Sequence, residues 1–185
     1  MSTNVCSKGL VEVMTRIILL VGAICFVALG RPSDAGAQEG GGGAEGGSEF
    51  SLFIGSMLPN QIDGVTEILP VFGGRYGLPT ARLGVAEFGF GNTHAEGVDF
   101  TTFSASLRAD LPAIDTFIGF VYGGLDISYF RPAGSEDRKT DTGLHVGAGL
   151  SVYASDTLWF RSDLKFNASP GTSLSLLFGI VFQSP

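Results

Sequence analysis

The chain has 185 residues, of which 44% are hydrophobic and only 16% charged, and its 18 acidic residues outnumber 11 basic ones. This length allows one domain or two small ones, and the acidic balance argues against a nucleic-acid-binding protein, which would need a basic face. A polytopic helical membrane protein is excluded, because the longest apolar run, Ile17–Gly30, is shorter than the roughly 20 residues that a spanning helix needs.

This apolar run is the first segment of the chain with a recognisable pattern. Arg16 precedes it, and Ala35-Gly36-Ala37 follows it as a small-x-small motif. A short apolar stretch with a flanking positive charge and such a motif is typical of a secretory signal peptide. We predict that residues 1–37 form the signal peptide and that cleavage falls between Ala37 and Gln38.

Export limits what can hold the rest of the chain together. Both cysteines, Cys6 and Cys25, precede the cleavage site, and Met14 is an alternative start that would shorten the signal. The exported chain is therefore expected to lack disulfides and to depend on hydrogen bonds and burial. Only two lysines remain, Lys139 and Lys165, whereas a soluble secreted domain carries many more surface charges. Much of the surface is therefore expected not to face water.

Residues 38–49 are rich in glycine and acidic, and we predict that they form a flexible arm. Residues 50–185 contain eight segments in which apolar residues recur at every second position, the period of a β-strand, separated by turn residues. The predicted strands are 50–57, 68–78, 81–91, 98–111, 116–130, 143–154, 158–167 and 173–183.

The connections between these segments alternate in length. Tight turns are predicted at 78–80, 112–115 and 155–156, and mostly longer links at 58–67, 92–97 and 131–142, with a short one at 168–172. Short turns at one end and longer loops at the other are typical of an up-and-down outer-membrane barrel, and the strands are long enough to cross a bilayer. We therefore predict an all-β, eight-stranded antiparallel transmembrane barrel with both termini on the periplasmic side.

Each predicted strand has an apolar face and a face of glycine, serine and charged residues. An arginine or lysine that faces lipid near the membrane midplane costs about 2–4 kcal/mol, so in a membrane the charged face must point into the lumen. There, charges of both signs can form the ion-pair network that a charged interior requires. The predicted members are Arg75, Glu87, Arg108, Asp110, Asp126, Arg161, Asp163 and Lys165.

Aromatic residues near the strand ends are candidates for the two interfacial girdles of such a barrel. We assign Phe117, Phe160 and Phe182 to the inner girdle, and Tyr129 and Phe166 to the outer one. The alternative is a soluble, lipocalin-like fold in which the apolar faces point inward and bind a hydrophobic ligand.

The last predicted strand carries a further pattern. Ser175–Gln183 reads SLLFGIVFQ, with alternating hydrophobic residues, Gly179 in the middle and Phe182 near the end. It resembles the closing strand of bacterial outer-membrane proteins, which the barrel-assembly machinery reads. With eight strands, residues 49–185 resemble the small OmpA/OmpX-type outer-membrane barrels. The resemblance implies insertion into a Gram-negative outer membrane, in contact with its lipids and lipopolysaccharide.

An eight-stranded barrel is just wide enough inside for side chains, so we expect the charged lumen to be plugged. The sequence shows no phosphate loop, zinc-ligand spacing or dinucleotide fingerprint, and we predict no catalytic, cofactor or metal site. The rival is an outer-membrane lipid-modifying enzyme that would use a histidine. His94 is predicted in the second outer loop, and His145 at the outer end of its strand, with Asp126 and Ser128 on the strand before it.

The predicted loop 134–141 (GSEDRKTD) is strongly charged. Such a loop could bind a surface ligand, although its carboxylates do not have the spacing of an EF-hand calcium loop. The sequence thus predicts a non-enzymatic outer-membrane barrel that serves envelope structure or surface interaction through its outer loops, without a nucleic-acid partner.

Overall fold

The computed structural model describes residues 47–60, 68–80, 84–95, 98–131, 137–168 and 171–184. In these ranges every regular element is a β-strand, and no helix there is long and apolar enough to cross a membrane. The predicted signal peptide, its cleavage site between Ala37 and Gln38, and most of the arm lie outside the described residues.

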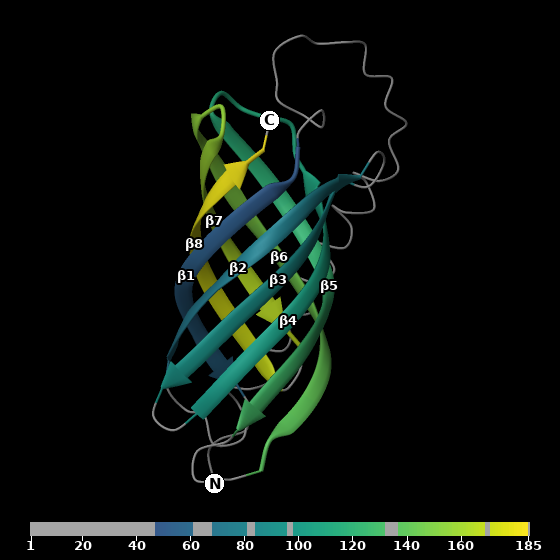
Figure 1. Cartoon of the computed structure of the whole chain (residues 1–185), viewed down its shortest axis with the longest axis vertical. Helices are drawn as coiled ribbons and strands as arrows, with labels where there is room; N and C mark the ends of the chain where they lie inside the picture. The colour runs from purple at the N-terminus through teal and green to yellow at the C-terminus, as the bar shows by residue number, and fades with distance from the viewer. Residues whose placement is uncertain are drawn as a thin grey trace, which may run out of the picture. The chain divides into compact units, whose positions relative to one another are not determined.

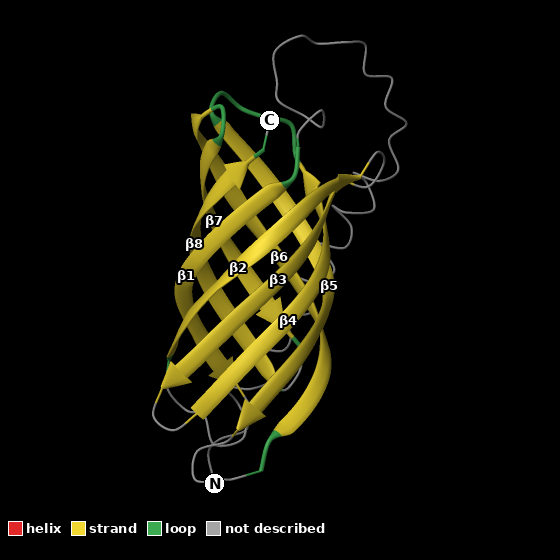
Figure 2. Ribbon diagram, in the orientation of Figure 1, coloured by secondary structure: helices red, strands yellow, loops and turns green. Residues whose placement is uncertain are grey.

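Eight antiparallel strands form one closed barrel, in which each strand pairs with the next and β8 pairs with β1 (Figure 1). The predicted all-β, eight-stranded antiparallel barrel is confirmed, and Figure 2 shows the strands wrapped around one barrel. The strands are β1 (Glu49–Asn60), β2 (Leu69–Thr80), β3 (Gly84–Ala95), β4 (Val98–Asp110), β5 (Phe117–Arg131), β6 (Lys139–Ser155), β7 (Leu158–Asn167) and β8 (Thr172–Gln183).

The barrel closes where β1 and β8 run side by side, from Glu49 opposite Gln183 to Asn60 opposite Thr172. We call the end at which β1 begins and β8 ends the inner end, and it lies at the top of Figure 1. The connections after β2, β4 and β6 are at this end. Those after β1, β3, β5 and β7 lie at the outer end.

Side chains alternate between the two faces of the barrel wall. Large apolar side chains point outward, and Ile54, Leu125 and Leu144 are each more than 60% exposed. Polar and charged side chains such as Glu87 and Arg161 point inward and are buried. This is the arrangement of a membrane barrel and the opposite of the inward apolar face that a lipocalin-like fold requires.

Several predicted boundaries were wrong, and β1, β3 and β6 each extend further than expected. β6 begins at Lys139 rather than at residue 143, because residues 139–142 continue the pairing with β5. β3 extends to Ala95, whose register partner is Val98, so most of the expected long loop 92–97 belongs to the strand and His94 lies in it. β1 begins at Glu49, the last residue assigned to the arm. Strand pairing is a backbone interaction, so polar side chains do not end it.

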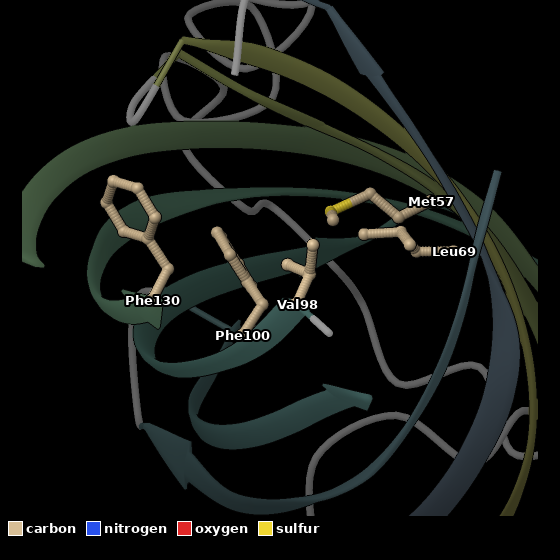
Figure 3. Close-up of a cluster of buried hydrophobic side chains, with 5 residues drawn as sticks. All are labelled: Met57, Leu69, Val98, Phe100 and Phe130. Carbon is tan, nitrogen blue, oxygen red and sulfur yellow. The ribbon is translucent and has the colours of Figure 1, made fainter. Parts of the chain in front are cut away.

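A hydrophobic cluster occupies the outer half of the lumen. It contains Met57, Leu69, Val98, Phe100 and Phe130, contributed by β1, β2, β4 and β5, with Val71 packed against it (Figure 3). These residues point inward although most inward side chains nearby are polar, so the outer lumen has a small apolar core of its own. We call this group the outer cluster.

Candidate functional site: a charged lumen

The inner half of the lumen contains a network of ion pairs centred on Glu87 of β3. Its carboxylate accepts hydrogen bonds from Arg161 Nη1 at 2.5 Å and from Arg108 Nη1 at 2.6 Å. Only 3% of Glu87 is exposed. One buried carboxylate thus neutralises part of two guanidinium groups, from β4 and β7.

Asp163 of β7 is the second centre of this network. Arg75 donates to both of its carboxylate oxygens, at 2.8 and 3.0 Å, and Arg161 Nε donates at 3.1 Å. The Tyr122 hydroxyl donates to the same carboxylate at 2.7 Å. Because a bidentate Arg–carboxylate pair fixes both distance and orientation, Asp163 ties β2 and β5 to β7 across the lumen.

Arg108 continues the network toward the inner end. Its guanidinium donates to both carboxylate oxygens of Glu49, at 2.8 and 3.0 Å, and to both of Asp110, at 2.7 and 3.1 Å. With Glu87, this gives Arg108 three carboxylate partners. The sequence analysis missed the role of Glu49, because it assigned this residue to the arm.

Asp126 of β5 organises a second polar group, nearer the outer end. It accepts a hydrogen bond from Lys165 Nζ at 3.0 Å and another from the Asn167 side-chain amide. His145 Nδ1 also lies 3.0 Å from this carboxylate, but without the alignment of a hydrogen bond. The other ring nitrogen of His145, Nε2, is 2.8 Å from Ser106 Oγ.

Aromatic rings cover the guanidinium groups in the lumen. The Arg161 guanidinium carbon lies 4.2 Å from the centre of the Phe120 ring, and that of Arg75 lies 4.7 Å from the centre of Phe53. At these distances a cation is attracted to the face of the ring, and the stacked ring also excludes water from it. Phe120 is itself almost completely buried.

Two glycines allow side chains to meet across an intervening strand. Gly124 of β5 lies in register between Ser106 of β4 and His145 of β6, and a Cβ there would be 2.7 Å from Ser106 Cα. Gly147 of β6 leaves space for the Tyr122 ring, since a Cβ there would lie 2.3 Å from Tyr122 Cζ. A larger residue at either position would displace the polar group beside it.

The structure brings all the predicted lumen residues into these contacts. Four further partners were not predicted from the sequence, namely Glu49, Ser106, Tyr122 and Asn167. Ser128, which the sequence placed on the strand before His145, has its hydroxyl 3.3 Å from that of Thr102, and Ser106 is the serine in contact with His145. The predicted lumen residues are Arg75, Glu87, Arg108, Asp110, Asp126, Arg161, Asp163 and Lys165.

The two histidines lie in different environments. His145 is buried in the lumen, whereas His94 is exposed near the outer end of β3 and contacts Asp99, which also accepts a hydrogen bond from Arg131. In the described part of the chain, no three side chains of the metal-ligating types are grouped so that they could hold an ion.

The aromatic residues assigned to the girdles all belong to the outward series of their strands. Phe117 begins β5, Phe160 lies near the start of β7 and Phe182 lies near the end of β8, so all three are at the inner end. Tyr129 and Phe166 lie near the outer ends of β5 and β7. All are about half exposed except Phe166, which is less so. Their placement at two levels of the barrel is what the prediction requires, and their contact with membrane interfaces stays a prediction.

Comparison with known proteins gives solved structures of the same architecture. The N-terminal β-barrel domain of Pseudomonas aeruginosa OprF superposes with a TM-score of 0.58 at 17% identity, covering 75% of this chain and 98% of that one. Neisserial surface protein A superposes with a TM-score of 0.55 at 15% identity, and the match covers 73% of this chain and 94% of that one. Ail, the attachment invasion locus protein of Yersinia pestis, gives 0.51 at 15% identity, covering 75% and 99%.

No protein-family model matches the chain, and no curated protein sequence does. At 15–17% identity the three structures establish the fold, and the resemblance predicted from the closing strand and the strand number is confirmed at that level. The chain has the fold of the small eight-stranded outer-membrane β-barrels of the OmpA/OmpX type.

Proposed function

We propose that this protein is a non-enzymatic integral outer-membrane barrel with a plugged lumen, which serves envelope structure or surface interaction through its outer loops. The observation that carries this proposal is the distribution of side chains across the barrel wall. Large apolar residues such as Leu125 and Leu144 point outward, while the charged network around Glu87 and Asp163 fills the inner half of the lumen. Such a wall suits hydrocarbon outside and leaves no open channel inside.

The same arrangement suggests the partners of the barrel. Its outward face would contact outer-membrane lipids, and the outer ends of β3–β6 would reach lipopolysaccharide head groups and surface ligands. β8 combines the closing position in the sheet with an outward series of hydrophobic residues that ends in Phe182. It is therefore the strand that we expect the barrel-assembly machinery to read during insertion.

Expression of the full gene in a Gram-negative host should place the protein in the outer-membrane fraction. Its band should shift on a denaturing gel between unboiled and boiled samples, because a closed hydrogen-bonded barrel resists the detergent until it is heated. Gly147→Val provides the matched control, since its side chain would overlap the Tyr122 ring and the variant should show no shifted band. Recovery of the native chain in the soluble periplasm, with no shift, would refute the proposal.

A second candidate function is a lipid-modifying hydrolase, and the contact of Ser106 with His145 favours it. With Asp126 on the other side of the ring, these residues have the connectivity of a Ser–His–Asp triad. However, His145 Nδ1 is not aligned with Asp126, whose carboxylate is held by Lys165 and Asn167. The His145 and Asp126 side chains are also fully buried, with no room for a lipid substrate. We therefore favour a structural role for this group.

A fluorophosphonate probe distinguishes the two functions, because it reacts only with a serine that a neighbouring base activates. We expect no labelling of Ser106 in the folded barrel, and we expect His145→Ala and His94→Ala to leave the lipid composition of the host membrane unchanged. Labelling that Ser106→Ala abolishes and Ser128→Ala does not would instead establish the hydrolase.

A further inference from the structure

A small cavity lies inside the barrel between the ion-pair network and the outer cluster. Its volume is about 60 Å³. A buried water needs roughly 10–15 Å³ and polar partners, so the cavity has room for a few water molecules. Its lining includes the apolar residues Met57, Val71 and Phe100 and the polar residues Arg75, Lys165 and Asn167. We call it the lumen chamber, and its walls carry the hydroxyl groups of Thr93, Thr102, Ser104 and Ser175.

The outer cluster covers the chamber toward the outer end. Each of its five core residues is at most 7% exposed, and the rings of Phe100 and Phe130 are packed with their centres 6.0 Å apart. A constriction of apolar side chains blocks ions even where it leaves some space, because water and ions are unstable in it. The outer cluster is thus a barrier by its own chemistry, independent of the charges below it.

The ion-pair network covers the chamber toward the inner end. Arg75 is held by Asp163 and Lys165 by Asp126, so both cations at the base of the chamber are fixed by buried carboxylates. Closer to the inner end, Glu87 accepts hydrogen bonds from both Arg161 and Arg108. This barrier consists of bonded charges, and it shares no side chain with the outer cluster.

We propose that the lumen is closed twice, by the outer cluster and by the ion-pair network, with the lumen chamber between the two closures. The proposal rests on the plugged lumen of the proposed function and adds that either closure suffices alone. Ser175 marks the boundary, because its register partners are Met57 of the outer cluster on β1 and Lys165 of the Asp126 group on β7. Its side chain lines the chamber, and Ser175 is buried.

The test places a cysteine in the chamber. Ser175→Cys is introduced into the full chain, and its modification by a small charged thiosulfonate reagent is followed in purified barrel, with mass spectrometry to separate it from Cys6 and Cys25. The rate of modification of Ser175→Cys is compared in three backgrounds. The first is the native chain, and the second carries Phe100→Ala/Phe130→Ala. The third carries Arg75→Ala/Glu87→Ala/Arg161→Ala/Asp163→Ala, a set that leaves the net charge unchanged. Thr140→Cys, on an exposed strand position at the outer end, is the control for free access.

In the native background, Ser175→Cys should react at least about 100-fold more slowly than Thr140→Cys, because thiol modification requires access. Either truncated background should raise its rate at least about tenfold, since each opens the chamber from one end. In planar bilayers, each truncated variant alone should conduct no better than the native barrel, whereas their combination should form a pore.

Two results would overturn the double closure. Rapid modification of Ser175→Cys in the native background would mean that the chamber is open, and conduction by one truncated variant equal to that of the combination would mean a single barrier. Heat-modifiability reports folding of each variant. If the network variant does not fold, a slow rate in the Phe100→Ala/Phe130→Ala background still contradicts the proposal. Failure of the native chain to enter the outer membrane would instead refute the proposed function.

Discussion

Glu87→Ala should destabilise the folded barrel by about 3–5 kcal/mol, because removing one partner of a buried ion pair leaves the others as uncompensated charges. Glu87 is buried and accepts hydrogen bonds from both Arg161 and Arg108. Arg108 keeps Glu49 and Asp110, but Arg161 keeps only its bond to Asp163. The measurement is a urea titration of barrel folded into lipid vesicles, scored by the unboiled, heat-modifiable band.

The free energy of unfolding of the double variant Glu87→Ala/Arg161→Ala should be closer to that of the native barrel than the value for Glu87→Ala alone. Removing both partners eliminates the unpaired charge, and the two substitutions should couple by about 1–3 kcal/mol. Asp110→Ala is the matched control, since Asp110 binds the same Arg108 but its side chain is 38% exposed, and its loss should cost less than about 1 kcal/mol. Equal losses for Glu87→Ala and Asp110→Ala would contradict a buried network that stabilises the barrel.

Leu125→Arg should cost about 2–4 kcal/mol when the barrel is folded into a bilayer, because it would place a charge in hydrocarbon near the midplane. Leu125 lies in the middle of β5, points outward and is 62% exposed, with Ala105 and Leu144 as its neighbours in register. The same urea titration in vesicles measures the loss.

The control is Thr140→Arg, on the outer-end extension of β6, where an arginine should cost no more than about 1 kcal/mol. If the outward face met water instead of lipid, Leu125→Arg would also change the free energy of unfolding by no more than about 0.5 kcal/mol. A near-neutral Leu125→Arg would therefore refute contact between this face and the membrane, even if the barrel fold itself were intact.

The sequence predicted the sheet well, because a two-residue period reports directly which face a side chain occupies. β7 was predicted with its observed bounds, since Arg161, Asp163 and Lys165 lie on one face and the other face is apolar except at Ser162. The start of β6 was missed because Lys139–Thr142 are polar on both faces, and there the alternation of hydrophobicity carries no information. Their pairing with β5 depends on register, which composition does not reveal.

The partners within the lumen were harder to predict for a geometric reason. The alternation of apolar and polar residues along each strand predicts that Ser106 and His145 point inward. However, they belong to β4 and β6, which are not adjacent strands. They meet only because Gly124 of β5 lies between them without a side chain. Adjacent strands alone offered Ser128 as a conceivable partner of His145, whereas Ser106 is the serine in contact with the ring. Glycines on the inward face, read together with the register, would have indicated which side chains can reach across.

The closing seam between β1 and β8 has a consequence for how the barrel forms. The other seven pairings of the described sheet join strands that follow each other in the chain, so each can form as a local hairpin with little loop-closure entropy. The β1–β8 pairing, by contrast, must bring together segments at opposite ends of the sheet, and contacts of this kind slow folding. The seam is therefore the step at which a row of hairpins becomes a ring. Until it forms, both edge strands present unpaired backbone groups that could capture a strand from another molecule.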